Sequence, residues 1–198
     1  MVAQPSQPRF MSIEEFRALE QADPDTKYEY IDGQAYMMAG GSADHARVSS
    51  NMVRALEDAL GDCPCLVYNS DLHVRIGLSR LTLPDVTVTC DQRDMGKVTE
   101  IRSPRVVVEV LSDSTEAYNR GAKFALYRAC PTVQEYVLVA TKYQAVEVFR
   151  RTLRVWEYQE YGPDDEVELT SIGVRFPVSA LYKRTTVPER LEAPEGEV

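Results

Sequence analysis

The sequence predicts a mixed α/β fold, in which a central β-sheet is flanked by helices and preceded by a helix and a β-hairpin. The segment PRVVVEVLS, residues 104–112, is nearly continuously apolar, as is typical of a central strand covered on both faces. Residues 105–140 predict strand, helix and strand in succession, the pattern of a right-handed crossover between parallel strands. Three strand-like segments in quick succession then predict a meander.

The N-terminal part predicts a short helix and a hairpin. Ser12 is placed to cap a helix at 12–21, and Glu15 stands at the capping-box position three residues later. Residues 27–40 form two strand-like halves joined at Asp32-Gly33, which is a strong hairpin signal.

The middle of the chain predicts one long helix and several strands. Residues 42–61 repeat apolar side chains with a helical period and end on a glycine. Residues 66–77 predict one bent strand or two short ones. Residues 83–90 alternate with period two, so one face of that strand is expected to be buried. Residues 91–103 predict a polar loop.

The C-terminal half predicts a helix and then mostly strands. Residues 115–130 are expected to be helical, with Pro131 as the stop. The expected strands and one last helical turn are 133–140, 144–151, 152–159, 168–176 and 177–182.

The length of 198 residues fits one domain, which we place at 12–185 between a flexible N-terminus at 1–11 and an acidic, disordered tail at 186–198. No apolar run approaches the roughly 20 residues of a membrane span, so no membrane association is expected. The polar N-terminus shows no secretory signal, which favours a cytoplasmic location.

The four cysteines do not suggest a disulfide framework. Cys63 and Cys65 are separated by one proline, whereas Cys90 and Cys130 stand apart at the ends of other segments. We expect free thiols packed as small hydrophobic groups. A zinc site is poorly supported, because no second close pair of Cys or His residues accompanies the first.

Two acids interrupt strand-like segments. Asp85 opens the segment PDVTVTC, and Glu109 lies inside the valine-rich segment at 104–112. A carboxylate in such a strand is costly to bury unless a cation or hydrogen bonds compensate it. The simpler alternatives are that Asp85 only begins a strand or turn and that Glu109 pairs with an arginine.

Four motifs, in order, resemble the restriction endonuclease-like Uma family, which belongs to the PD-(D/E)XK nuclease superfamily. The motifs are YEYIDG, PDVTVTC, VVVEVLSDST with NRGAKFALYR, and VQEYVLV, and the resemblance spans residues 12–182. It implies a restriction-endonuclease-like fold, a mixed sheet flanked by helices with the site at the strand ends. It also implies that Asp85 and Glu109 bind metal, that the carbonyl of Val110 is a further ligand, and that Glu29 is a third site acid.

The sequence departs from the superfamily motif at the lysine that should follow the second acid by two positions. That position is Leu111, and the resemblance points instead to Lys123 on the following helix. A long ammonium side chain on an adjacent helix can reach the same point, where it would orient water or neutralise the scissile phosphate. The alternative is an ordinary solvent-facing lysine.

Three further assignments stay open. Glu29 supports the metal or pairs with a basic residue across a strand. His45 contacts phosphate or a glutamate, or is only a polar residue at a helix start. Arg120 contacts phosphate, or only the side chains of Asp113 and Glu116.

The hypothesis that unites these residues is a Mg²⁺- or Mn²⁺-dependent endonuclease that hydrolyses DNA phosphodiester bonds. The formal net charge is −9, but residues 102–154 carry nine Lys/Arg against five Asp/Glu, so this segment is expected to hold DNA. The alternative is a catalytically inactive nuclease-fold protein that acts as a binding or dimerisation module. A homodimer is expected in either case, because C2 dimers are the commonest oligomers.

Overall fold

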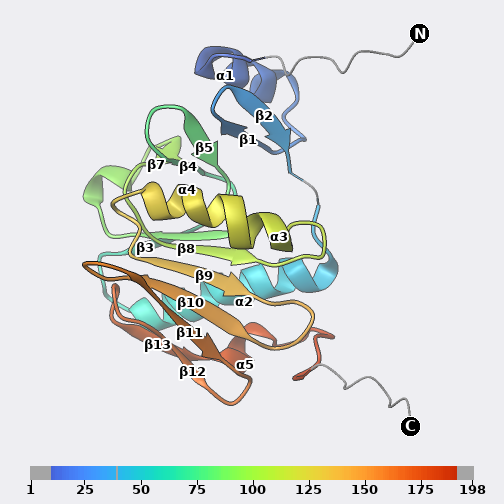
Figure 1. Ribbon diagram of the computed structural model, residues 1–198, viewed down its shortest axis with the longest axis vertical. Helices are drawn as coiled ribbons and strands as arrows, with labels where there is room; N and C mark the ends of the chain where they lie inside the picture. Colours follow the sequence, from blue (N-terminus) through green and yellow to red (C-terminus); the bar gives the residue numbers. More distant parts are fainter. Residues whose placement is uncertain (1–9, 39, 191–198) are drawn as a thin grey trace.

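The computed structural model describes residues 10–38 and 40–190 (Figure 1). Most of the predicted N-terminal and C-terminal tails therefore lies outside the described residues. Two sheets and a small hairpin make up the fold, with helices against them. The helices are α1 (Ile13–Ala22), α2 (Ala43–Leu60), α3 (Glu116–Tyr118), α4 (Phe124–Ala129) and α5 (Val178–Leu181), with a 3-10 turn at Gln92–Asp94 and a π-helical turn at Asn119–Lys123.

The larger sheet has six strands in the order β11-β10-β9-β8-β6-β3. Strands β8 and β9 are parallel and the other neighbours are antiparallel, so the predicted mixed sheet is confirmed. The chain between β8 and β9 is helical, as the strand–helix–strand pattern predicts. The strands are β3 (Leu66–Asn69), β6 (Val86–Thr89), β8 (Pro104–Val110), β9 (Glu135–Val139), β10 (Val146–Arg151) and β11 (Trp156–Tyr161).

Helices cover both faces of this sheet, with α2 on one face and α4 on the other (Figure 1). Because side chains alternate along a strand, Val106, Val108 and Val110 of β8 join the core beneath α2. Val107 and Leu111 join the core beneath α4. Glu109 has the same parity as these last two residues and therefore faces α4.

The smaller sheet has five strands in the order β2-β1-β5-β4-β7, and α1 packs Phe16 against Tyr30 and Leu81. Both halves of the capping box at Ser12 are formed. The hairpin at Asp32-Gly33 is also confirmed, with φ of 48° and 92° at the two residues, as a tight hairpin turn requires. Its strands are β1 (Tyr28–Ile31), β2 (Gln34–Met37), β4 (His73–Arg75), β5 (Arg80–Thr82) and β7 (Glu100–Ile101).

Three local predictions need correction. Strand β5 is a separate element ahead of the predicted strand at 83–90, and the predicted loop at 91–103 contains β7. The single strand predicted at 168–176 is instead a hairpin, in which the end of β12 (Glu166–Leu169) and the start of β13 (Val174–Pro177) are joined by a turn at 170–173. Each of these short strands forms only by pairing with a neighbouring strand, and a local sequence pattern does not reveal that pairing.

The expectation of four free thiols is wrong, because Cys65 and Cys90 form a disulfide. The antiparallel register pairs Leu66 of β3 with Thr89 of β6, so the next residue outward on each strand stands opposite the other. Spacing along the chain does not show this pairing. None of the described helices has the length and hydrophobicity needed to span a membrane.

Candidate active site

The candidate acids meet at the junction of the two sheets. Glu109 comes from β8 of the larger sheet and Glu29 from β1 of the smaller one. The chain that links β5 to β6 runs through this junction and carries Asp85. Asp85 and Glu109, the two acids that interrupt strand-like segments, therefore face one region although they are far apart in sequence.

Lys123 joins two of these acids. Its Nζ lies 2.8 Å from Glu109 Oε1 and 3.0 Å from Glu29 Oε1, and all three side chains are only 3% exposed. The solvent-facing alternative for Lys123 is therefore excluded. Burial opposes the charge of the ammonium, but attraction to Glu109 and Glu29 outweighs it and raises the pKa of Lys123 above its ordinary value.

The backbone around Lys123 departs from a regular helix. Asn119–Lys123 forms a π-helical turn between α3 and α4, a feature that is frequent at functional sites. Lys123 is the last residue of this turn, and α4 begins immediately after it. The segment thus directs a lysine, rather than an apolar residue, toward Glu109.

Glu109 has a second partner that the sequence reasoning missed. Tyr127 Oη lies 3.0 Å from Glu109 Oε1 and 3.1 Å from Thr82 Oγ1, and the tyrosine side chain is fully buried. Tyr127 follows Lys123 by four residues, which places both on one helix face. That spacing is the signal that would have identified it.

Burial governs the electrostatics of Glu109. It raises the pKa of this carboxyl to about 8, opposed by the charge of Lys123 and reinforced by the negative charges of Asp85 and Glu29. The single ammonium of Lys123 thus contacts the carboxyl groups of both Glu109 and Glu29. A further cation at this position would therefore replace the proton that the raised pKa keeps on Glu109 at neutral pH.

Glu29 is fixed by both the backbone and Lys123. The backbone N–H of Leu83 donates to Glu29 Oε1 over 2.8 Å, two residues ahead of Asp85. This bond ties the hairpin strand β1 to the linker that carries Asp85. Of the two alternatives for Glu29, the structure shows a basic partner, but that partner lies on the helical segment rather than across a strand.

Asp85 contacts the end of β8. Its Oδ2 accepts a 2.7 Å hydrogen bond from the N–H of Val110, and His45 Nε2 lies 3.5 Å from the same oxygen. The same Nε2 donates to the carbonyl of Val110 over 3.0 Å. The hydrogen bond to Asp85 raises the pKa of His45, against burial, which lowers it. His45 therefore contacts two of the three groups that the resemblance assigns to metal binding.

Gly41 makes room for the His45 ring. A Cβ atom on Gly41 would lie 2.6 Å from His45 Nδ1, which is closer than such atoms approach. A Cβ atom on the neighbouring Gly40 would meet nothing within 4 Å. Gly41 does not have a positive φ, so the restriction there is one of space rather than of backbone conformation.

Arg120 lies away from these acids in an ion-pair cluster. Its guanidinium contacts Glu147 through two hydrogen bonds of 2.6 and 2.7 Å and contacts Glu116 over 3.0 Å. Other cations of the basic segment are engaged similarly: Lys142 contacts Glu116, and Arg150 contacts Glu135. Much of the positive charge at 102–154 is therefore compensated internally.

The chemistry of the oxygens suits a hard divalent cation. Within the described residues no group of three or more His, Cys, Asp or Glu side chains is arranged as a metal cage. Mg²⁺ commonly takes only one or two carboxylates and completes its octahedron with water and phosphate. Asp85, Glu109 and the Val110 carbonyl are donors of this kind, so they could hold such an ion.

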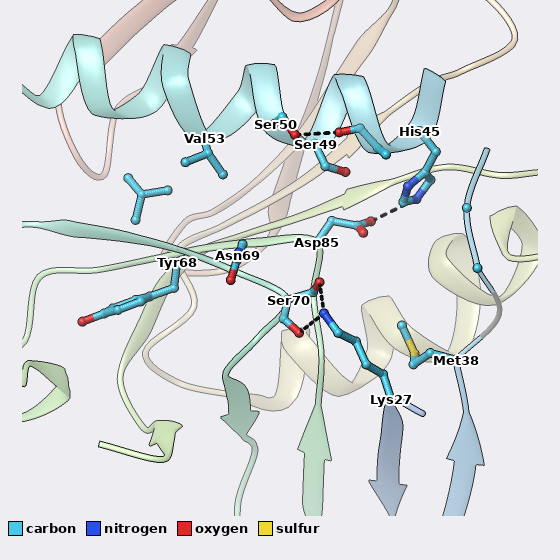
Figure 2. A pocket seen from close by; sticks show the side chains of 14 residues that line it. Lys27, Met38, His45, Ser49, Ser50, Val53, Tyr68, Asn69, Ser70 and Asp85 are labelled. Carbon is cyan, nitrogen blue, oxygen red and sulfur yellow. Dashed lines mark hydrogen bonds and ion pairs between the residues drawn. The ribbon is translucent and has the colours of Figure 1, made fainter. Parts of the chain in front are cut away.

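The site opens to solvent through a cleft of about 700 Å³ (Figure 2). Asp85 and His45 line the cleft, and their side chains are 17% and 18% exposed. Glu109, Glu29 and Lys123 lie deeper in the protein. Asp85 is therefore the candidate acid that a molecule in the cleft would meet first.

Comparisons with known proteins bear on the family and the fold of this chain. Residues 13–179 match the family model of Uma2, described as "Putative restriction endonuclease". Two proteins of Synechocystis sp. (strain ATCC 27184 / PCC 6803 / Kazusa) are similar. Uncharacterized protein slr1290 is 39% identical over 175 residues, covering 87% of this chain and 92% of its own length. Uncharacterized protein sll1609 is 31% identical over 149 residues, covering 73% of this chain and 84% of its own length.

A solved structure shares the fold. The crystal structure of "a putative nuclease belonging to DUF820 from Anabaena variabilis ATCC 29413" aligns with a TM-score of 0.68 and 18% identity. The alignment covers 87% of this chain and 97% of the other chain. At this identity the likeness establishes the architecture, which agrees with the mixed sheet expected from the sequence.

Proposed function

Because this chain belongs to the Uma2 family of "putative restriction endonucleases", as its motifs predict, we propose that it is a metal-dependent endonuclease that hydrolyses DNA phosphodiester bonds. Asp85, Glu109 and the Val110 carbonyl would hold Mg²⁺ or Mn²⁺. The bound ion would lower the pKa of an attacking water and stabilise the charge that develops on the phosphorus oxygens.

The remaining residues have supporting roles in this proposal. Lys123 would place its positive charge beside the attacked phosphate and orient the nucleophilic water. Glu29 would hold the Lys123 ammonium together with Glu109. Tyr127 would fix the Glu109 carboxylate through its hydroxyl. His45, bound to Asp85 and to the Val110 carbonyl, would set the orientation of both.

One observation carries the proposal: the Lys123 ammonium lies within hydrogen-bond distance of Glu109 although the superfamily position for the lysine is Leu111. A buried ammonium between two carboxylates is costly to maintain for stability alone. Its position beside Glu109, the acid proposed to bind metal, supplies the cation that the strand lacks.

The test is cleavage of supercoiled plasmid DNA with Mg²⁺. We expect the wild-type protein to nick or linearise the plasmid and EDTA to stop the reaction. Asp85→Ala and Glu109→Ala should each abolish it, whereas Glu116→Ala, which removes an acid of the Arg120 cluster, should not. Cleavage that survives both site changes would refute the assignment.

The second candidate function is the binding or dimerisation module without catalysis. The acidic net charge of −9 and the engagement of Lys123 by two carboxylates favour it. This candidate predicts no cleavage by the wild type at any Mg²⁺ concentration, together with a stable dimer in sedimentation. Metal-dependent cleavage by the wild type excludes it, and the homodimer itself stays a prediction.

A further inference from the structure

We infer that the cleft between α2 and β3 is the binding site for one strand of the nucleic-acid substrate, and that it leads the scissile phosphate to Asp85. The inference rests on the proposed function and names the residues that hold the substrate. Figure 2 shows the cleft with Ser49 and Ser50 of α2 on one side, Asn69 and Ser70 on the other, and Asp85 beside His45 toward one end.

The position of the cleft gives it access to the candidate acids. Asp85 lines it, and Asp85 is also bonded to the backbone of Val110, next to Glu109. Glu109 and Lys123 are almost fully buried and do not line the cleft, so a phosphate in the cleft would meet Asp85 before them. A molecule that lies along the cleft would present its backbone at this point.

The size of the cleft selects one strand. A volume of about 700 Å³ lies within the roughly 300–1,000 Å³ range of small-ligand pockets, which suits a short piece of one strand. A duplex needs room for two backbones, which its grooves of about 12 Å and about 6 Å hold apart, so a cleft with the volume of a small-ligand pocket would take one strand at a time. The substrate strand must therefore be single-stranded, or be displaced from its complement, where it enters.

The lining supplies polar groups suited to a phosphodiester backbone. The hydroxyl oxygen of Ser49 is buried without a hydrogen-bond partner, the one such side-chain atom among residues 10–38 and 40–190. Buried polar atoms are nearly always paired, so this hydroxyl marks unmet hydrogen-bonding capacity just behind the wall of the cleft, which a rotation of the Ser49 side chain would bring to its surface. Lys27 at the floor contacts Ser70 and Asp71, and its charge is already compensated.

Two exposed arginines of α2 flank the lining residue Ser50, although neither lines the cleft itself. Arg47, Ser50 and Arg54 are exposed and follow one another at the i, i+3, i+7 spacing of one helix stripe. Neither arginine has an acidic partner within the described part of the chain, unlike much of the basic segment at 102–154. These two guanidinium groups are therefore available to contact phosphates of a strand that passes Ser50.

The experiment measures binding of a fluorescein-labelled 12-nucleotide single strand by anisotropy in EDTA, where no cleavage occurs. The Arg47→Ala/Arg54→Ala variant should weaken binding at least tenfold. It should also reduce the slope of log affinity against log salt by about 1.4, from two lost phosphate contacts at about 0.7 each. The control is Arg154→Ala, an exposed arginine between β10 and β11 at the other edge of the sheet, which should change affinity less than twofold.

A charge introduced in the cleft gives a second test. Ser50→Glu should weaken binding of the strand, whereas Ser50→Ala should not. A duplex of the same sequence should bind the wild type less tightly than the single strand. Unchanged binding by the double arginine variant, preference for the duplex, or no binding of the strand by the wild type would overturn the inference. Wild-type plasmid cleavage separates the outcomes: cleavage that the double variant retains in full refutes only the cleft assignment, whereas no wild-type cleavage refutes the proposed function.

Discussion

Lys123 Nζ lies 2.8 Å from Glu109 Oε1, although the two residues belong to different elements and are both almost fully buried. The pair joins the end of β8 to the π-helical turn ahead of α4. In the nuclease motif the lysine lies on the same strand as the acid. Here a lysine from the helical segment reaches that acid instead. This relationship predicts that stability and, in the proposed function, chemistry both depend on Lys123.

Lys123→Met should destabilise the protein strongly. Removing Lys123 leaves the buried Glu29 carboxylate without its cation, and breaking a buried ion pair in this way typically costs about 3–5 kcal/mol of unfolding free energy. Urea denaturation at pH 7 measures the change. Lys142→Met is the matched control, because Lys142 pairs with Glu116 while 53% exposed and should change stability by less than about 1 kcal/mol. Equal effects of the two substitutions would contradict the account.

Tyr127→Phe should weaken metal binding more than it affects folding. The hydroxyl contacts Glu109, so its loss frees the carboxylate to take other orientations. The fold should lose about 1 kcal/mol, as expected for one hydrogen bond. Tyr30→Phe removes a buried hydroxyl that donates to the carbonyl of Met11, away from the site. It should cost similar stability and leave Mn²⁺ affinity unchanged; a similar affinity loss in both variants would show that Tyr127 has no special role.

Gly41→Ala should disturb the site through His45. The new methyl group would displace a ring that contacts Asp85 and the Val110 carbonyl, and disturbing groups that orient metal ligands typically costs about 10–100-fold in metal affinity. We expect the loss at the lower end of that range, measured by Mn²⁺ titration. Gly40→Ala adds the same methyl group where nothing lies within 4 Å, and its affinity should stay within twofold of wild type. Equal Mn²⁺ affinities of Gly41→Ala and Gly40→Ala would show that His45 does not influence metal binding.

Stability in acid should depend on Glu100. Its carboxylate contacts Arg75, Arg17 and Arg102, and the hydrogen bond from Arg75 is the main cause that lowers the pKa of Glu100. Because the folded-state pKa is lower than the unfolded one, the stabilisation is complete above about pH 4.5 and is lost as the pH falls through the folded-state value. Glu100→Gln should be less stable at pH 7 but should lose less on acidification. Thermal melts from pH 3 to 7 test this, and parallel curves for the two proteins would contradict it.

The sequence was most informative where the signal is local. The capping box at Ser12, the turn at Asp32-Gly33 and the valine-rich strand around Glu109 each depend on a few neighbouring residues, and all three are confirmed. The family motifs identified Lys123 as the lysine to examine, and the structure places it beside Glu109.

Contacts between distant segments were not predictable in the same way. The disulfide between Cys65 and Cys90 depends on the register of β3 against β6, which no local pattern encodes. The contact of Tyr127 with Glu109 depends on how the helical segment lies across the sheet. The engagement of Arg120 by Glu147 likewise depends on a strand far along the chain, and it reduces the charge that this segment can offer to DNA.

Calorimetric titration with Mn²⁺ tests most directly whether Glu109 belongs to a metal site. The wild type should bind the ion, and Glu109→Gln should lose that binding. Glu147→Gln is the control, since Glu147 is also a buried strand glutamate held by a cation but lies in the Arg120 cluster. Retained binding in Glu147→Gln with loss in Glu109→Gln is the predicted result. No binding by the wild type, or equal binding by both variants, would contradict the account.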